Sequence, residues 1–360
     1  MAFILAATGS AVGLGNIWRF SYMVGDSGGA AFVLVYLACV ALVGLPILVA
    51  EWLIGRRGQE NPINSMLDLA RQSGRLPAWA LVGASGVLAA FLILSFYGVI
   101  GGWSLSYTLS SVTGAFSGQD ADAIGALFGG LLGSPVTMTL WHTAFMALVI
   151  FIVARGVTKG LEGAVRTMMP ALVVLMLVLV GYGMTTGHFG EALAFMFRPD
   201  WSAVTGGVVL AAMGQAFFTL SLGMGIMMAY GSYLGEDVNL ISTARTVIIL
   251  DTVIALLAGM AIFPIVFANG MSPGEGPGLI FVSLPVAFGN MTGGTLLGLM
   301  FFLLLTFAAL TSAISLLEPV VELVEERTPL SRVAATLTSG VAVWALGIAA
   351  LMSFNVWGDF

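Results

Sequence analysis

Acidic residues lie within or beside long apolar stretches of this sequence, where an unpaired charge is costly. Asp251 has the apolar residues 247–250 before it and 253–258 after it. Such a group usually faces a partner, water or an ion, so we expect Asp251 to have a function. Glu51 and Glu318 lie nearer to the ends of their apolar stretches, and these side chains could also extend to the polar surface.

A glycine-rich stretch interrupts the first apolar run, with Gly9, Gly13 and Gly15 close together. Glycine weakens a helix, because it has the most backbone freedom to lose. Residues 217–226 form a second stretch of this kind, again inside an apolar run. Matching interruptions in two halves of a membrane protein indicate a substrate and ion site. The glycines could equally serve only to let two helices pack closely.

An opened helix would offer ligands for a cation. We expect unwound backbone at Gly9, Ala11 and Val12, where free carbonyl oxygens would suit Na⁺ as they suit other hard cations. Asn16 adds a side-chain oxygen to this set. The helix that restarts after the break would point its positive N-terminal end at the site, where a carboxylate could bind.

The composition predicts a membrane protein. Of the 360 residues, 59% are hydrophobic and only 8% are charged, whereas about a quarter are charged in soluble domains. No basic cluster suggests a nucleic-acid partner. The apolar runs predict nine segments in the lipid bilayer, at about 2–22, 29–54, 79–112, 136–154, 167–186, 203–232, 240–268, 293–324 and 331–353. Leu279 to Phe288 is too short to span, and we expect it to cap one face as a helix.

The loop charges predict the orientation of the chain. If the N-terminus is cytoplasmic, only Arg19 and Arg198 of the 12 Lys and Arg residues fall outside. This arrangement satisfies the positive-inside rule. The inner loops then hold Arg56, Arg57, Arg71, Arg75, Arg155, Lys159, Arg166, Arg245, Arg327 and Arg332.

Five motifs in order along the chain resemble the neurotransmitter:sodium symporter family. They are residues 9–20 (GSAVGLGNIWRF), 28–32 (GGAAF), 44–52 (GLPILVAEW), 217–223 (FFTLSLG) and 308–312 (AALTS). The resemblance implies an all-α membrane helix bundle with discontinuous first and sixth helices. It also implies the leucine-transporter type of inverted repeat, five helices plus five, within one transmembrane domain over residues 1–360. The first repeat would cover about 1–186 and the second about 203–353, with its tenth helix missing.

The same resemblance implies two sodium sites and a substrate site between the two breaks. The first sodium would be held by Ala11, Asn16, Thr219 and a polar group near Asp251. The second would be held by Gly9, Val12, Ala308, Thr311 and Ser312. The substrate would contact Ala11, Gly13, Gly15, Ile93, Tyr97, Phe218, Thr219, Ser221, Met224, Ser312 and Leu316. Arg19, Tyr97 and Phe218 would form an outer gate, and Tyr233 and Glu326 would belong to an inner gate.

Details of these positions narrow the expected substrate. Family members that carry monoamines have an aspartate at the position of Gly13, so this chain is expected to carry an amino acid with its own carboxylate. Ile93, Met224 and Leu316 would form an apolar pocket for its side chain, favouring an aliphatic or aromatic one. Chloride-dependent relatives hold the anion near the positions of Tyr36, Gln215 and Thr219. Asp251 could supply that charge, so we expect transport without chloride.

The sequence therefore predicts sodium-coupled symport of a neutral amino acid across the cytoplasmic membrane by alternating access. One alternative is the same architecture without sodium coupling. Another is an inactive fragment, because the chain begins close to its first helix and ends after the ninth. A membrane enzyme is disfavoured, since no His-Glu-x-x-His motif, Ser-His-Asp set or paired intramembrane aspartates appear. The sequence leaves the oligomeric state open.

Overall fold

The computed structural model describes residues 2–156, 160, 162–274 and 276–358, and these residues form helices and loops without a strand. Lys159, which supports the predicted orientation, lies outside the described residues. The α-helices are α1 (Ala2–Ala11), α2 (Phe20–Asp26), α3 (Ala30–Cys39), α4 (Leu45–Gly58), α5 (Pro62–Gln72), α6 (Ala80–Val112), α7 (Ala121–Leu132), α8 (Pro135–Ala154), α9 (Gly163–Gly183), α10 (Phe189–Phe197), α11 (Gly206–Thr219), α12 (Ile226–Ser232), α13 (Leu240–Ala268), α14 (Leu284–Asn290), α15 (Gly294–Arg327) and α16 (Arg332–Met352).

Short helices of other types join some of these elements. A π-helix over Gly15–Arg19 leads into α2, and another over Val40–Gly44 joins α3 to α4 in one long rod. A third π-helix, Leu279–Ser283, precedes α14, and short 3-10 helices cover Pro77–Trp79 and Trp201–Ala203.

Seven helices in the described residues are long and apolar enough to span a membrane. They are Ala30–Gly58, Pro77–Val112, Pro135–Ala154, Gly163–Gly183, Leu240–Ala268, Gly294–Arg327 and Arg332–Met352. The two remaining predicted segments are the first and the sixth, where the helix is broken into α1 and α2 and into α11 and α12. The prediction of an all-α membrane bundle with these two discontinuous helices is therefore confirmed.

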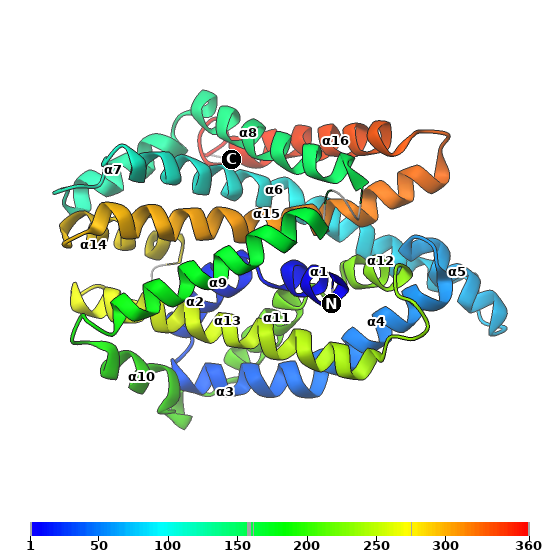
Figure 1. Ribbon diagram of the computed structural model, residues 1–360, viewed down its shortest axis with the longest axis horizontal. Helices are drawn as coiled ribbons and strands as arrows, with labels where there is room; N and C mark the ends of the chain where they lie inside the picture. The colour runs from blue at the N-terminus through cyan, green and yellow to red at the C-terminus, as the bar shows by residue number, and fades with distance from the viewer. Residues whose placement is uncertain (1, 157–159, 161, 275, 359–360) are drawn as a thin grey trace.

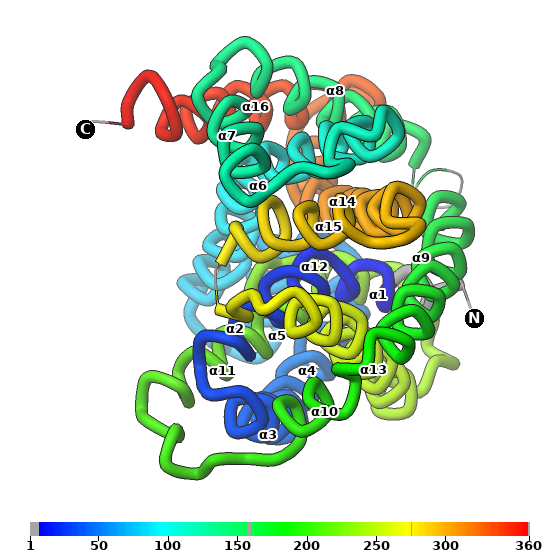
Figure 2. Tube along the Cα trace, turned by 90° about the vertical axis from the view of Figure 1, so that its left-hand side faces the viewer, coloured from blue at the N-terminus to red at the C-terminus, as the bar shows by residue number. Residues whose placement is uncertain are grey.

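The two broken segments lie in the interior of the bundle. Figure 1 shows α1 and α12 between the long helices α13 and α15, and Figure 2, which looks along the bundle, shows them ringed by the other helices. The outward faces of the surrounding helices carry exposed large apolar side chains, as a surface in contact with lipid requires. Examples are Leu81, Leu140, Val174, Ile249 and Val341.

The short apolar stretch at 279–288 forms a cap, as predicted. The π-helix Leu279–Ser283 and α14 lie at the end of the bundle where α7 and α10 also lie (Figure 1). Phe281 of this cap packs against Trp103 of α6 with ring centroids 5.5 Å apart. The loops that follow α4 and α15 lie at the opposite end, which we call the inner end.

Candidate functional site

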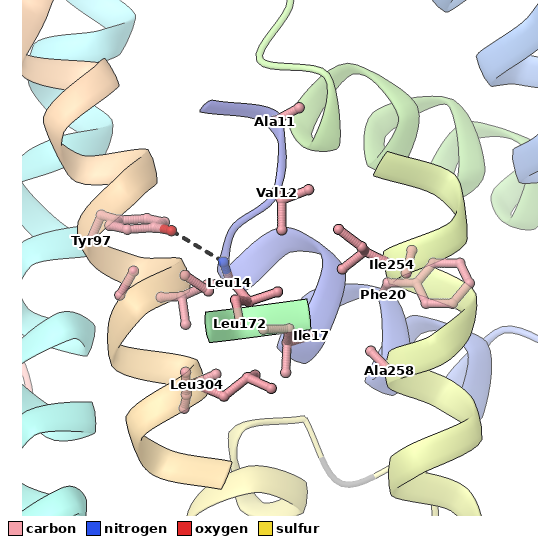
Figure 3. Packing of buried hydrophobic residues seen from close by; sticks show 14 of the residues in the cluster. Ala11, Val12, Leu14, Ile17, Phe20, Tyr97, Leu172, Ile254, Ala258 and Leu304 are labelled. Atoms are coloured by element: carbon pink, nitrogen blue, oxygen red, sulfur yellow. Dashed lines mark hydrogen bonds between the residues drawn. The ribbon is translucent and has the colours of Figure 1, made fainter. Parts of the chain in front are cut away.

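The first break consists of residues that leave the helix between α1 and the π-helix at Gly15. Figure 3 shows the chain narrowing to a non-helical link from Ala11 to Leu14. Side chains satisfy its free amide groups, as a membrane interior requires. Asn16 Oδ1 accepts from the Gly13 N–H at 2.9 Å, and the Tyr97 hydroxyl accepts from the Leu14 N–H at 3.2 Å.

The prediction of unwound backbone at Gly9 and Ala11 is wrong, because both residues belong to α1. The last carbonyl groups of any α-helix lack a partner within the helix, so a helix end can offer oxygens without unwinding. The Gly13 N–H would bond to the Gly9 carbonyl in a continued helix, but it donates to Asn16 instead. Glycine at 9 also has a packing reason, since a Cβ there would lie 2.6 Å from Val165 of α9.

The second break runs from Leu220 to Gly225, between α11 and α12, close to its predicted position. Gly223 and Gly225 have φ values of 75° and 71°, which favour glycine. Ser221 adopts a φ of 55° without being glycine. Its hydroxyl donates to the Ser10 carbonyl at 3.4 Å, so the two breaks lie next to each other.

Glu51 supports this second break from α4. Its Oε1 accepts from the Gly223 N–H at 2.7 Å, and the side chain is buried. The prediction allowed Glu51 and Glu318 to extend to the polar surface, and it is wrong for both. Glu318 is only 1% exposed, and it pairs with Arg332 at 2.5 Å. Arg56 and Arg57 follow Glu51 in the sequence and favour a position at the membrane surface. The fold instead turns the Glu51 side chain inward, toward the backbone amide of Gly223.

Three side chains from separate elements meet beside the first break. Asn16 Nδ2 donates to Asp251 Oδ1 at 2.7 Å and to Thr219 Oγ1 at 2.9 Å. Thr219 Oγ1 lies 3.1 Å from each carboxylate oxygen of Asp251. All three residues have no exposed area. The sequence left the alignment of Asp251 uncertain by one residue, and these contacts identify Asp251 itself as the residue that reaches the predicted first sodium set.

Part of the predicted second sodium set also comes together. Thr311 Oγ1 lies 3.2 Å from the Val12 carbonyl oxygen and 3.0 Å from that of Ala308. Ser312 differs, because its hydroxyl donates to the Ser10 carbonyl at 3.4 Å. The hydroxyls of Thr311 and Ser312 thus contact different parts of the first broken helix.

A cavity of about 20 Å³ lies between the two breaks. Its lining contains every residue of the predicted substrate set except Thr219, and it adds Ser10, which sequence reasoning missed. The lining residues are Ser10, Ala11, Gly13, Gly15, Ile93, Tyr97, Phe218, Ser221, Met224, Ser312 and Leu316. The cavity therefore combines backbone and hydroxyl groups at the breaks with apolar side chains opposite them.

A second cavity, of about 220 Å³, is lined by residues including Trp18, Arg19 and Phe96. Tyr97 and Phe218 line both cavities, so they form the wall between them, and their role as an outer gate stays a prediction. The Arg19 guanidinium lies over the Phe218 ring, 5.1 Å from its centroid.

The residues predicted as equivalents of an anion site differ in their contacts. The Tyr36 hydroxyl faces Asp251 and Thr219. Gln215 instead donates to the Gly15 carbonyl at 2.8 Å and accepts from Arg19 at 2.5 Å. In the described residues no hydrogen bond joins Gln215 to Asp251.

The predicted inner-gate residues have separate partners. The Tyr233 hydroxyl donates to Glu318 Oε1 at 3.0 Å. Glu326 accepts from the Asn61 backbone N–H at 2.9 Å and from the Asn61 side chain. Both residues lie at the inner end of the bundle, but no hydrogen bond in the described part of the chain joins them to each other.

Comparisons with known proteins agree with this arrangement. The sequence model of the Sodium:neurotransmitter symporter family matches residues 1–123 and 131–356. The chain is 41% identical to the uncharacterized sodium-dependent transporter YhdH of Bacillus subtilis, over 100% of this chain and 79% of that protein. It is 34% identical to an uncharacterized sodium-dependent transporter of Haemophilus influenzae, over 99% of this chain and 80% of that protein.

A solved structure is similar over the whole chain. The crystal structure of MhsT in complex with L-phenylalanine matches with a TM-score of 0.92 and 50% identity, covering 100% of this chain and 81% of that one. The prediction of the family from the five motifs is thus confirmed. The chain is a multi-pass membrane protein of the sodium:neurotransmitter symporter family, whose members are sodium-coupled transporters and not enzymes.

Proposed function

We propose that this chain carries a neutral amino acid with an aliphatic or aromatic side chain across the cell membrane, together with sodium, by alternating access. The cavity between the two breaks is the observation that carries this proposal. Its lining combines backbone and hydroxyl groups with apolar side chains, and these suit the charged end and the apolar side chain of a neutral amino acid. MhsT, which is 50% identical to this chain over the aligned residues, was solved with L-phenylalanine.

The substrate carboxylate would bind at the first break, near the backbone of Gly13 to Gly15 and the Tyr97 hydroxyl. Glycine at position 13 supports this placement. A Cβ there would collide with the Ser312 hydroxyl and come within 3.1 Å of the Tyr97 hydroxyl. Position 13 thus has no room for a carboxylate side chain of its own, and the ligand would have to bring the negative charge. The apolar side of the cavity, with Ile93, Met224 and Leu316, would receive the substrate side chain.

We propose two sodium sites. The first would use the Ala11 carbonyl, Asn16, Thr219, Asp251 and the substrate carboxylate. The second would use the carbonyls of Gly9, Val12 and Ala308 and the hydroxyls of Thr311 and Ser312. In the described residues no group of three or more His, Cys, Asp and Glu could hold a metal ion. Carbonyl and hydroxyl oxygens with one carboxylate are the ligands of a weakly held hard cation.

The same geometry supports a proposal of transport without chloride. Asp251 is fully buried, and its hydrogen-bond donors Asn16 and Thr219 are both neutral. No salt bridge to Asp251 occurs among the described residues. An ionised Asp251 would therefore be an uncompensated negative charge beside the proposed first sodium, and it would take the place of an anion.

We also infer two repeats of inverted topology, about 1–186 and 203–353, with the N-terminus in the cytoplasm. The two broken helices are the first helix of each inferred repeat, and they contact each other through Ser10 and Ser221. A site at the interface of such repeats is exposed to either side by movement of one repeat against the other.

Uptake into vesicles tests the proposal. The purified chain, reconstituted with an inward sodium gradient, is offered a panel of labelled amino acids. We expect uptake of apolar amino acids, no dependence on external chloride, and loss of uptake when potassium replaces sodium. The proposal would be contradicted if the chain preferred amino acids with charged side chains, or amines without a carboxylate, over apolar amino acids.

A further inference from the structure

Polar contacts tie α12 to α15 at the inner end of the molecule. The Tyr230 hydroxyl and the Ser315 hydroxyl lie 2.9 Å apart. Farther toward the inner end, Tyr233 donates to Glu318, and the Ser232 hydroxyl donates to Glu322 Oε1 at 3.2 Å. Figure 1 shows α12 at the same end of the bundle as α5, and α12 packs against α4. These contacts would have to break for the inner end to open.

Glu322 is the one member of this set whose charge has no partner in the described residues. The side chain is 7% exposed, and its Oε2 is buried without a hydrogen bond. The guanidinium of Arg332 binds other carboxylates through its two terminal nitrogens, Glu318 at 2.5 Å and Glu325 at 3.3 Å, and no ion pair joins it to Glu322 in the described residues. Glu326, one turn further along α15, is bound by Asn61.

The charges that face Glu322 come from three elements. Glu318 and Glu326 flank it on α15, Tyr233 comes from the end of α12, and Arg332 begins α16. The pair of Glu318 and Arg332 is neutral as a whole, so an ionised Glu322 would add an unpaired negative charge to a buried site. Burying an unpaired carboxylate costs far more than burying a neutral carboxyl group.

We propose that Glu322 binds a proton while α12 and α15 are closed together, and that it releases this proton to the cytoplasm when they separate. Separation removes Ser232 and Tyr233 and lets water reach the carboxylate, which then ionises. Proton binding and inner opening therefore exclude each other. The two equilibria are linked, so each changes the other by the same factor. Opening of the inner end weakens proton binding to Glu322, and acid on the cytoplasmic side therefore favours the closed inner end.

This inference rests on the proposed alternating access, and a distance measurement tests it without any substrate. Cys39, the single cysteine, is replaced by alanine. Spin labels are then attached to Asp237→Cys, after α12, and Thr328→Cys, after α15, which are both exposed. In sodium-free buffer, raising the pH should increase the open population by up to about tenfold per pH unit, the limit for one linked proton.

Variants identify the proton carrier. Glu322→Gln, whose side chain is always neutral, should stay closed and lose the pH dependence. Glu322→Met should behave in the same way, and it has no polar side-chain group that needs a hydrogen bond. Glu325→Gln is the matched control, since its side chain on the same helix is 40% exposed, and it should respond like the parent. A pH response that survives in both Glu322 variants would overturn the proposal. A parent chain without uptake would contradict the proposed function but leave this test intact.

Discussion

Asp251 illustrates how one residue connects the fold with the proposed mechanism. It lies in the middle of α13, where apolar neighbours surround it in sequence, and in the fold it meets Asn16 and Thr219. Two neutral donors orient a carboxylate, but they do not compensate its charge. A sodium ion beside it would do so, and this is why Asp251 is central to the proposed first sodium site.

Replacing Asp251 by asparagine should make uptake sensitive to chloride. The parent should transport equally in chloride and in gluconate. Asp251→Asn should lose most uptake in gluconate, by about tenfold if roughly 1.4 kcal/mol of sodium binding is lost, and should recover part of it in chloride. Initial uptake rates in the two salts measure the effect. An Asp251→Asn variant that remains indifferent to chloride would contradict the assigned role.

Gly13 should not tolerate even a methyl group. In Gly13→Ala the Cβ would press on Ser312 and Tyr97, and overpacking of about 1–3 kcal/mol corresponds to about 5- to 150-fold weaker substrate binding. Gly181→Ala, in α9, is the matched control, because no atom lies within 4 Å of its Cβ position. Equilibrium binding of a labelled substrate compares the two variants, and equal affinities would refute the tight contact.

At the scale of elements, the sequence predicted where two helices break, since glycines and small polar residues interrupt apolar runs there. It could not predict how far α1 continues, because a helix end and an unwound segment both offer free carbonyl oxygens. It also missed the partners of the breaks. Glu51 supports the second break from a helix far away in sequence, and only the packing of α4 against α12 brings it there.

Removing the Glu51 carboxylate should destabilise the second break. Glu51→Ala leaves the Gly223 N–H buried without an acceptor, at a cost of about 1–3 kcal/mol. We expect a melting temperature lower by several degrees, on the order of 2–4 °C per kcal/mol, and weaker sodium-dependent substrate binding. Glu51→Gln keeps an acceptor oxygen and should lose less. Identical melting temperatures for the parent and Glu51→Ala would show that this bond contributes nothing.

At the scale of the whole molecule, the residue types alone determined the membrane class, and the order of five motifs determined the family. The close packing of α12 against α4 was not predictable, although glycines permit it. A Cβ at Gly231 would lie 2.7 Å from the Trp52 carbonyl oxygen. Such contacts depend on which helices become neighbours, and apolar runs of similar composition do not encode this.

The proposed orientation predicts which residues are reached from outside the cell. In a Cys39→Ala background, Gln119→Cys should react with a membrane-impermeant thiol reagent on intact cells. Thr328→Cys should react only after the membrane is opened. Both positions are exposed in the structure, so burial cannot explain a difference between them. The opposite labelling pattern would reverse the proposed topology.

Reciprocal binding of sodium and substrate tests the central claim most directly. If both share the cavity between the two breaks, sodium raises the affinity for an apolar amino acid, and that amino acid raises the affinity for sodium by the same factor. Equilibrium binding of labelled substrate across a sodium titration, with labelled sodium measured in parallel, gives both factors. The account predicts that they are equal and larger than one. An amino-acid affinity that does not change between sodium and potassium would contradict it.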